Sequence, residues 1–486
     1  MAETTLDNLD KIVSLSKARG YIYQSSEIYG GLAAVYDYGP LGSELKKNIK
    51  DLWWNSMTRK HDNVVGLDAA IFMHPKTWEA SGHVEGFNDP MIDDKQSKKR
   101  YRADMLIEQH ILKLREKGKE DQADELQQKL DTTGTRKGLC EDLYEIIMEE
   151  EIRAPESGAF DWTDVRQFNL MFKTHYGATS SGDDDAIYLR PETAQGIFVN
   201  YKNVMDTARV QVPFGIAQIG KAFRNEVVAR QFVFRMREFE QMEMQYFVKP
   251  GNDEEQYGNW LDKRLQWHKD IGIREENLRV TPHPDDKLAH YARAAADIQY
   301  HYPIGWQEVE GIHNRTDFDL SRHQEYSGKK MEYFDQKEQE RYIPYVIETS
   351  VGLDRISLMV LCDAYREEEV DGDSRTVLKM HPKLAPTKAG IFPLVKKPEL
   401  QGLAHKIEND LNDQFMVRYD ESGSIGKRYR RQDEAGTPFC ITVDFDGLDD
   451  QTVTIRHRDD MAQERVSVDK LEMVIRNRAK SWTPES

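Results

Sequence analysis

The sequence predicts an α+β protein of at least two domains, the second of which is α/β in character. Its 486 residues exceed what one hydrophobic core usually serves. Strand-like alternation of side chains occupies residues 214–226 and 237–248. Residues 380–387 contain two prolines and separate a helical segment from an apolar strand, which is typical of a domain boundary. We therefore expect a first domain over residues 1–384 and a second over residues 388–486.

The strand at residues 237–248 has two different faces. Because strand side chains alternate, one face carries Phe239, Gln241, Glu243, Gln245 and Phe247, and the other carries Met242, Met244, Tyr246 and Val248. A row of Gln and Glu is unusual in a core. This face therefore either meets solvent or lines a site, and alternation alone does not choose.

A helical insertion is expected at about residues 95–163. Residues 100–130 contain apolar side chains at helical spacing among many charges and no proline, which predicts one or two exposed helices. A break follows at residues 153–158. Beyond the domain boundary we expect a helix at 402–414, strands at 439–443 and 452–455, and a last helix near Leu471.

Composition indicates a globular protein of the cytoplasm. Hydrophobic residues make up 39% of the chain and charged residues 31%. The amino terminus lacks the features of a secretory signal, and no apolar run approaches the ~20 residues that a membrane span requires. The three cysteines, Cys140, Cys362 and Cys440, form no paired spacing, so the sequence predicts neither a disulfide framework nor a cysteine-rich metal site.

The net charge of −18 argues against binding of nucleic acid by the whole surface. The deficit lies mostly upstream, because residues 388–486 contain 16 Lys and Arg against 18 Asp and Glu. Positive charges gather in the peptide KRYRR at residues 427–431, where an aromatic ring is interleaved. Such a cluster suits phosphate contact and base stacking, although a solvated loop has the same composition.

Arginines next to carboxylates recur in strand contexts. They occur as FRNE at residues 223–226, RMREF at 235–239 and GLDR at 352–355. Each alone is compatible with a surface ion pair worth ~0–1 kcal/mol. Together they combine bidentate phosphate donors with an aromatic ring and acidic acceptors, which predicts a nucleotide site without a glycine-rich phosphate loop.

These peptides resemble the class II aminoacyl-tRNA synthetases. FRNE with RMREF is similar to motif 2 of that class, GLDR to motif 3, and YGPLGSEL at residues 38–45 to motif 1, which lies at a dimer interface. RPETAQG at 190–196, FEQME at 239–243, FNLMFK at 168–173 and ETSVG at 348–352 are similar to the homodimeric glycyl-tRNA synthetases. GSIGKRYR at 423–430 and GTPF at 436–439 resemble the anticodon-binding domain shared with threonyl, prolyl and histidyl enzymes. The resemblance covers nearly the whole chain and implies a catalytic domain built on a mostly antiparallel sheet.

The resemblance implies three sets of site residues. ATP would be bound by Arg224, Asn225, Glu226, Phe234, Arg235, Met236, Arg237, Glu238, Phe239, Glu308, Val309, Gly352, Leu353, Asp354 and Arg355. Glycine would be bound by Arg102, Glu192, Phe239, Glu240, Gln241, Met242, Glu243, Glu348, Thr349, Ser350, Val351 and Gly352. The tRNA would contact Lys427, Arg428, Tyr429, Arg430 and Arg431.

Within these sets, Arg224 and Arg355 would be the catalytic residues. Arg224 would contact the α-phosphate, Glu226 the adenine amino group and Phe239 the adenine ring, while Arg235 and Arg355 would hold the far phosphates. Mg²⁺ would be held near the ATP with the help of Glu308. The resemblance leaves the role of Arg315 open.

The resemblance also bears on zinc and on assembly. Several bacterial relatives carry a Cys-Pro-x-Cys-Gly zinc knuckle where this chain has APESG at residues 154–158, so we expect no zinc site there. The expected partners are glycine, ATP, tRNA(Gly) and a second copy of the chain.

The resemblance implies ATP-dependent attachment of glycine to tRNA(Gly) through a glycyl-adenylate. Three alternatives stay open: a class II synthetase for threonine, proline or serine, a paralogue that activates an amino acid without tRNA, and a non-catalytic RNA-binding or scaffold protein. The intact arginines speak against the last of these, and the carboxy-terminal domain speaks against the second.

Overall fold

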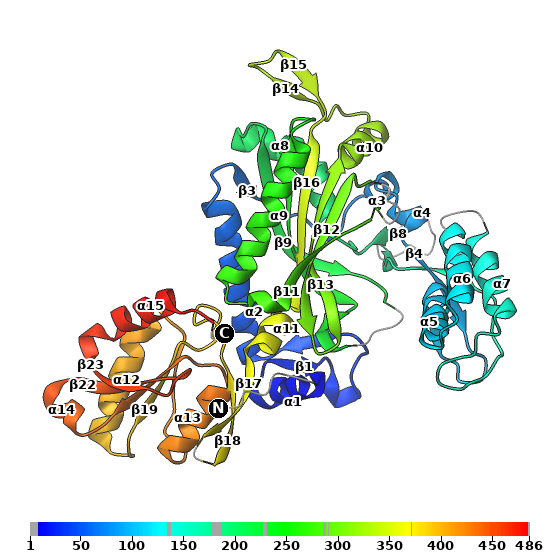
Figure 1. Ribbon diagram of the computed structural model, residues 1–486. Helices are drawn as coiled ribbons and strands as arrows, with labels where there is room; N and C mark the ends of the chain where they lie inside the picture. The colour runs from blue at the N-terminus through cyan, green and yellow to red at the C-terminus, as the bar shows by residue number, and fades with distance from the viewer. Residues whose placement is uncertain are drawn as a thin grey trace. The chain divides into compact units, whose positions relative to one another are not determined.

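The structure, a computed structural model, describes residues 8–133, 138–175, 186–226, 231–284, 288–289, 291–370 and 372–484 (Figure 1). The chain forms two compact units. The first comprises Met1–Ala70, Glu192–Lys221 and Gln231–Ser486, and the second comprises Ile71–Pro191 and Ala222–Arg230. Each unit is described by itself.

A seven-stranded sheet forms the centre of the first unit. Its strands, in spatial order, are β11 (Leu278–Pro282), β12 (Ala294–Tyr302), β13 (Gly305–Thr316), β16 (Tyr345–Gly352), β10 (Glu238–Val248), β9 (Phe214–Phe223) and β3 (Val64–Gly66). From β11 through β12, β13 and β16 to β10, neighbouring strands are antiparallel, and β3 is parallel to β9. The expected α+β class with a mostly antiparallel sheet is thus confirmed.

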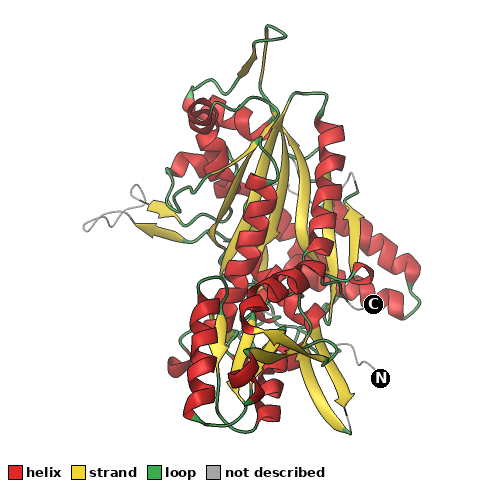
Figure 2. Cartoon of the chain, turned by 90° about the vertical axis from the view of Figure 1, so that its left-hand side faces the viewer, coloured by secondary structure: helices red, strands yellow, loops and turns green. Residues whose placement is uncertain are grey.

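Helices cover both faces of this sheet (Figure 2). On the apolar face, Met242, Met244 and Ile347 join one core with Trp260 and Trp267 of α9 (Asp253–Asp270). On the other face, α8 (Ala194–Ala208) and α10 (Phe318–Ser327) share a second core with β9 and β10. The alternation predicted for β10 therefore separates an apolar face from a polar one.

Two short strands and two helices lie at the amino-terminal end of the first unit. After α1 (Leu9–Arg19), β1 (Ile22–Gln24) and β2 (Tyr36–Tyr38) form a hairpin, and α2 (Pro40–Trp54) follows with Pro40 at its first position. Gly42 lets α2 approach this hairpin closely, because a Cβ there would lie 1.9 Å from the carbonyl oxygen of Tyr21.

None of the helices in the described residues is long and apolar enough to cross a membrane.

A second sheet lies in the carboxy-terminal part of the first unit. Its order is β20 (Val417–Tyr419), β19 (Ala389–Pro393), β21 (Phe439–Val443), β22 (Thr452–His457) and β23 (Gln463–Ser467). Helices α12 (Pro398–Asn412), α13 (Ile425–Glu434), α14 (Asp446–Asp450) and α15 (Leu471–Ser481) accompany it. Strand β19 is parallel to β20 and β21, and the remaining pairs are antiparallel, so the expected α/β character is confirmed.

A buried ionic network joins this second sheet to a hairpin of the preceding segment. The hairpin consists of β17 (Tyr365–Val370) and β18 (Asp373–Leu378), after helix α11 (Leu353–Ala364). Arg375 of β18 donates to Asp433 at 2.9 Å and to Glu368 at 2.6 Å. Arg456 of β22 donates both terminal nitrogens to Asp433, at 2.9 and 3.1 Å. Asp433 therefore links elements on both sides of the predicted boundary.

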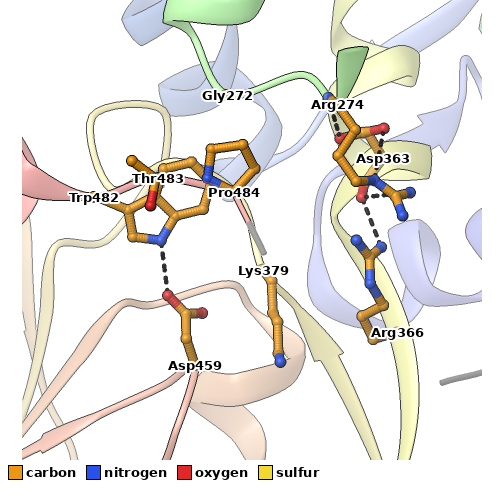
Figure 3. A pocket seen from close by; sticks show the side chains of 9 residues that line it. All are labelled: Gly272, Arg274, Asp363, Arg366, Lys379, Asp459, Trp482, Thr483 and Pro484. Atoms are coloured by element: carbon orange, nitrogen blue, oxygen red, sulfur yellow. Dashed lines mark hydrogen bonds and ion pairs between the residues drawn. The ribbon is translucent and has the colours of Figure 1, made fainter. Parts of the chain in front are cut away.

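The carboxy-terminal tail closes a small pocket of about 110 Å³ (Figure 3). The indole nitrogen of Trp482 donates to Asp459 at 2.8 Å, and on the other side of the pocket Arg274 pairs with Asp363 at 3.3 Å. Gly272 has a φ of 94°, and a Cβ there would lie 2.7 Å from the Trp482 ring. The tail thus packs on the turn that follows α9.

The second unit contains a three-stranded sheet and three helices. The sheet comprises β5 (Arg100–Arg102), β4 (Asn88–Asp93) and β6 (Arg166–Asn169), and the helices are α5 (Ala103–Glu116), α6 (Glu120–Thr132) and α7 (Leu139–Glu149). Their buried side chains form a separate core. The expected helices at residues 100–130 are therefore α5 and α6, and they pack inward as well as facing solvent.

Asp94 holds two loops of the second unit together. Its buried carboxylate accepts from the hydroxyls of Ser97 at 2.5 Å and Ser157 at 2.6 Å, and from two backbone amides. The hydroxyls of Ser157 and Ser97 hold the pKa of Asp94 at about 2, so the group stays ionised. In the described residues, no group of three or more His, Cys, Asp or Glu side chains is arranged to hold a metal.

The network around Asp433 generates a prediction about stability. Asp433→Ala should leave Arg375 and Arg456 buried without their shared carboxylate and lower the free energy of unfolding by about 3–5 kcal/mol. Denaturant unfolding followed by circular dichroism measures this change. Asp410→Ala, which removes the exposed partner of Lys406, is the matched control and should cost no more than ~1 kcal/mol. Equal effects of the two substitutions would contradict the structural role of Asp433.

Candidate active site

The polar face of β10 meets the polar faces of β16 and β13 at the middle of the large sheet. The register pairs Glu243 with Ser350, and Gln245 with Glu348, while His313 of β13 pairs with Glu348 from the other side. Glu243 is 1% exposed and Glu348 is 4% exposed. The row of polar groups expected from alternation therefore lines a buried site instead of facing solvent. We call Glu192, Glu243, Glu348 and the groups that contact them the acidic cup.

Glu243 lies in the acidic cup among neutral donors. The hydroxyl of Thr193 donates to its Oε2 through a short contact, and Nε2 of Gln245 donates to its Oε1 at 2.6 Å. The donors that reach this carboxylate in the described part of the chain carry no positive charge. Burial, reinforced by the charges of Glu348 and Glu192, raises the pKa of Glu243 well above its ordinary value. Glu243 is thus the group that carries a proton in the empty cup.

Glu348 has cationic partners. Arg315 donates to its Oε2 at 3.0 Å and Nδ1 of His313 lies 2.9 Å from its Oε1. Although burial opposes ionisation, Arg315 and His313 hold the pKa of Glu348 well below its ordinary value. Burial likewise opposes protonation of His313, but the hydrogen bond with Glu348 raises its pKa. The pKa values of Glu243 and Glu348 are therefore shifted in opposite directions, so Glu243 holds a proton more readily than Glu348 does.

Helices α8 and α10 fix the remaining side of the cup. Asp319 of α10 receives two hydrogen bonds from Arg315, at 2.8 and 3.1 Å. Gln195 of α8 donates to Glu192 at 3.0 Å and to Asp319 at 2.9 Å. His323 bonds the amide oxygen of Gln195 at 2.8 Å. Glu192 and Arg315 are therefore oriented by a hydrogen-bond chain that begins in α10.

Sequence reasoning missed several members of the cup. Arg315 was left without a role, and His313, Thr193, Gln195 and Asp319 were not singled out. The sequence pattern could have indicated His313 and Arg315, because side chains two residues apart in a strand such as β13 lie on the same face. The other three reach the cup through helices and loops, whose placement depends on tertiary packing.

Arg355 lies at the end of this sheet face, at the start of α11. Its guanidinium lies 4.5 Å from the centre of the Phe234 ring and donates to the backbone oxygen of Phe234 at 3.3 Å. It also pairs with the Glu308 carboxylate at 3.2 Å. The structure therefore brings together three members of the expected ATP set, Phe234, Glu308 and Arg355.

A β-bulge places Glu308 on the polar face. Between β12 and β13 the register shifts, so that Ile298 faces Glu310 and Gln299 faces Glu308. The extra residue, Val309, reverses the alternation. Glu310 points away from the cup to the apolar face, where Arg264 of α9 donates to it at 2.5 and 3.2 Å. Glu308 and Glu310 are two residues apart, yet they serve opposite faces.

Several residues of the expected sets are buried with their side chains in the core. They are Met236, Met242, Val309, Thr349, Val351 and Leu353. Their side chains pack in the interior, so only their backbone groups can face a ligand. Glu240 and Asp354 turn to Lys46 of α2, at 2.6 and 2.8 Å. The amide of Arg237 donates to the backbone oxygen of Ala34 at 2.9 Å.

Arg224, Asn225, Glu226 and Arg102 belong to the second unit. The Arg224 side chain donates to the backbone oxygen of Pro191 at 3.1 Å and lies 5.5 Å from the centre of the Phe87 ring. The amide of Asn225 donates to the backbone oxygen of Leu170 at 2.7 Å. Arg102 pairs with Asp104 and with Asp89, at 2.5 and 3.2 Å. These contacts of Arg224, Asn225 and Arg102 all lie within the second unit.

The basic cluster at residues 427–431 is helical and divides into two kinds of residue. Lys427 of α13 is exposed and Arg430 is half-buried. Arg428 is buried and donates to four backbone oxygens, those of Pro393, Leu394, Asp420 and Gly423. Tyr429 bonds Thr442 at 2.7 Å, and Arg431 pairs with Asp420 at 2.5 Å. Arg428 is therefore committed to holding its own domain together.

Three family models match the chain. The model described as "tRNA synthetase class II core domain (G, H, P, S and T)" matches residues 172–365. The model described as "Glycyl-tRNA synthetase insertion domain 1" matches residues 89–133 and 118–170. The model described as "Anticodon binding domain" matches residues 388–478.

Known proteins match over nearly the full length. A glycine–tRNA ligase of Chlorobaculum tepidum is 58% identical over 95% of this chain and 98% of its own. Those of Geobacillus kaustophilus and Treponema denticola are 53% and 51% identical, over 95% and 98% of this chain and 97% and 98% of their own. A solved structure, prolyl-tRNA synthetase of Cryptosporidium parvum with L-proline and AMP, has a TM-score of 0.62 at 14% identity, covering 99% of this chain and 77% of that one, and shows likeness of fold alone.

Similarity of this extent, together with the antiparallel sheet and its acidic face, decides the family. The chain belongs to the glycine–tRNA ligases of the class II aminoacyl-tRNA synthetases.

Proposed function

We propose that the chain activates glycine with ATP and transfers it to tRNA(Gly), as a glycine–tRNA ligase. The observation that carries this proposal is the acidic cup, in which Glu243 and Glu348 are buried side by side on one sheet face. The full-length similarity to glycine–tRNA ligases supports it.

The cup suits the ammonium group of the smallest amino acid. Glycine offers no side chain to hold, so recognition depends on its charge and on the exclusion of anything larger. Glu243 and Glu192 would accept from the ammonium group together with Ser350, while Arg315 keeps Glu348 in place from behind. Gly311 contributes to close packing, because a Cβ there would lie 2.7 Å from the His313 ring. A rigid, closely packed pocket disfavours a substrate with a Cβ more strongly than an accommodating pocket does.

Activation needs positioning and charge stabilisation more than a side-chain nucleophile. The glycine carboxylate attacks the α-phosphorus in line and pyrophosphate leaves. In our proposal Arg224 offsets the charge that develops on the α-phosphate, and Arg235 and Arg355 hold the leaving pyrophosphate. The stacking of Arg355 on Phe234 supports this role. The ring orients the guanidinium but, unlike a carboxylate, does not neutralise its charge.

Adenine and the metal complete the proposed ATP site. Glu226 would accept from the adenine amino group, and Phe239 would stack on the ring. The Glu308 carboxylate offers the hard oxygen ligands that Mg²⁺ prefers, so this residue fits the metal. Bound Mg²⁺ supplies positive charge to the phosphates. Arg102 is proposed to approach the glycine side.

The carboxy-terminal part is proposed to bind the anticodon arm of the tRNA. Lys427, Tyr429, Arg430 and Arg431 remain candidates for RNA contact, and we leave Arg428 out because backbone oxygens occupy its guanidinium. The proposal includes a catalytic domain over residues 1–384, with an insertion at about 95–163, and an anticodon-binding domain over 388–486. It also includes a homodimer and a cytoplasmic location.

Glycine-dependent exchange of pyrophosphate into ATP tests the proposal as a whole. Among the twenty amino acids, glycine should support exchange best, and Arg224→Ala should reduce the exchange rate by about 100-fold or more, because one preorganised charge is removed from the transition state. Arg115→Ala, which removes an exposed ion pair with Asp124, is the control and should leave the rate unchanged. Preference for threonine, proline or serine would refute glycine specificity, and an Arg224→Ala rate within a few-fold of wild type would remove Arg224 from the site.

Glu192→Gln tests the glycine side of the cup. The loss of a charge-assisted hydrogen bond, worth about 1.5–3 kcal/mol, should raise the Michaelis constant for glycine by about tenfold or more and leave that for ATP nearly unchanged. Steady-state exchange at varied glycine and ATP concentrations separates the two constants. Glu255→Gln on the exposed side of α9 serves as the control. An unchanged glycine constant would exclude Glu192 from the pocket.

The proton on Glu243 predicts pH-dependent binding of glycine. Since the raised pKa of Glu243 means that the empty cup holds a proton, binding of the ammonium group should release about one proton. Affinity for glycine should therefore rise with pH, by up to about tenfold per unit, while the amino group of glycine and Glu243 of the free protein both remain protonated. Titration calorimetry in two buffers of different ionisation enthalpy counts the proton. Binding without proton release would show that Glu243 is ionised in the empty cup.

The same pKa predicts how stability responds to pH. Because a raised pKa makes the folded state hold a proton that the unfolded state has lost, the stability associated with Glu243 is present at low pH and declines as pH rises above the ordinary value of glutamate, ~4.3. Glu243→Gln should remove that decline, so its melting temperature should fall less than that of wild type as pH rises above the ordinary value of glutamate. An identical pH profile would contradict the assignment.

A further inference from the structure

Asp354 is a meeting point for three segments that are far apart in the sequence. Its Oδ1 accepts from the Tyr38 hydroxyl at 2.7 Å and from Nζ of Lys46 at 2.8 Å. Its Oδ2 accepts from the backbone amide of Glu240 at 2.8 Å. Asp354 lies in the first turn of α11, where a negative charge also suits the helix dipole. The carboxylate thus ties α11 to β2, α2 and β10.

Lys46 bridges two carboxylates at this point. Its Nζ lies 2.8 Å from Asp354 and 2.6 Å from the Glu240 carboxylate, and 4.2 Å from the centre of the Tyr38 ring. The side chains of Lys46, Glu240 and Asp354 are 11%, 16% and 4% exposed, so solvent screens these pairs weakly. Burial opposes the charge on Lys46, but Asp354 and Glu240 raise its pKa above the ordinary value. The bridge is therefore a stable cation between two anions.

We infer that Lys46 is a positioning residue for the ATP site, because it fixes the start of α11, which carries Arg355, against the start of β10, which carries Phe239. Arg355 directly follows Asp354, and Phe239 directly precedes Glu240. Lys46 thus holds the two neighbours of the residues that would grip the phosphates and the adenine. This inference rests on the proposed ATP site.

Among the described residues of α2, Lys46 alone bridges the carboxylates of Glu240 and Asp354. Lys50, one helical turn later, reaches only the Glu240 carboxylate, at 3.4 Å. A cavity of about 370 Å³ borders Lys46, Glu240 and Asp354. On the side of this cavity, therefore, no packed side chains of the described residues hold the carboxylates of Glu240 and Asp354 in place. Without the ammonium group, the Glu240 and Asp354 carboxylates would repel each other, and this repulsion would oppose the hydrogen bond from the Glu240 amide that still joins the start of α11 to β10.

The acidic cup does not share atoms with this bridge. Glu243 and Glu348 are held by Thr193, Gln245, His313 and Arg315, none of which contacts Lys46. Loss of the bridge should therefore affect ATP more than glycine, and this difference separates positioning from general loss of stability.

The test is pyrophosphate exchange by the full chain carrying Lys46→Met. We expect the Michaelis constant for ATP to rise by about tenfold or more, since small displacements of positioned groups cost large factors in rate and binding. The constant for glycine should change by less than about twofold. Lys46→Arg, which keeps the charge, should restore most of the ATP affinity. Lys47→Met, which removes only an exposed pair with Asp51 from the same helix, should behave as wild type.

Two further variants keep the outcome decisive. If Lys46→Met does not fold, as judged by its melting temperature, Tyr38→Phe removes a single hydrogen bond from Asp354 and should produce a smaller rise in the ATP constant. Arg355→Ala tests the proposed ATP site itself. A raised ATP constant in Arg355→Ala with none in Lys46→Met or Tyr38→Phe would overturn the inference alone, whereas no change in Arg355→Ala would overturn the proposed phosphate grip. Equal rises in the ATP and glycine constants of Lys46→Met would show a merely structural role.

Discussion

The buried contact between Arg315 and Glu348 is the interaction on which the acidic cup depends. A carboxylate that is 4% exposed cannot remain ionised without a cationic partner, and Arg315 supplies one at 3.0 Å while Asp319 orients the guanidinium from behind. This arrangement leaves Gln245 free to bridge Glu348 and Glu243 through its amide nitrogen, at 2.7 and 2.6 Å. The geometry of both glutamates therefore follows from one ion pair, and the helix α10 that carries Asp319 becomes part of the site although it contributes no ligand.

Strand β13, which carries Arg315, also carries a buried glutamate on its opposite face. Glu310 of β13 is fully buried under α9, where Arg264 and His268 surround it at 2.5 and 2.8 Å. Burial opposes its ionisation, but Arg264 and His268 nevertheless hold its pKa below the ordinary value. The bulge at Val309 separates this structural glutamate from Glu308, which faces Arg355. One strand thereby contributes an acid to the core of the fold and another to the proposed phosphate site, and the bulge keeps the two charges on opposite sides of the sheet.

Much of this organisation could be predicted from the sequence where it depends on local pattern. The alternation in β10 identified the polar face, and the apolar strand expected after the prolines of residues 380–387 is β19. The bulge at Val309 could not be predicted, because it exists only through pairing with β12. The basic cluster at residues 427–431 was equally ambiguous, since α13 turns Arg428 inward to four carbonyl oxygens and leaves Lys427 outside. The role of Lys46 could not be predicted for the same reason, because its partners are Glu240 and Asp354, about 200 and 300 residues away in the chain. Local pattern shows which face is polar, whereas partners across the fold decide what each charge does.

Within the residues that the structure describes, Glu348 has cationic partners and Glu243 has only neutral donors, and this difference has a consequence for selectivity. If both carboxylates were paired with arginines, a substrate ammonium would have to displace a cation that is covalently part of the protein. If neither were paired, the empty cup would contain two buried negative charges, at a large desolvation cost. Pairing Glu348 and leaving Glu243 with neutral donors avoids both states, because the empty cup contains a proton where the filled cup contains an ammonium group. The summed charge of Glu243, Glu348 and whatever neutralises Glu243 is then the same before and after binding, because a proton neutralises Glu243 in the empty cup and the substrate ammonium group does so in the filled one. A larger amino acid carries the same ammonium group, and discrimination against it must therefore come from the rigid walls that His313, Gln195 and Arg315 support, and not from charge.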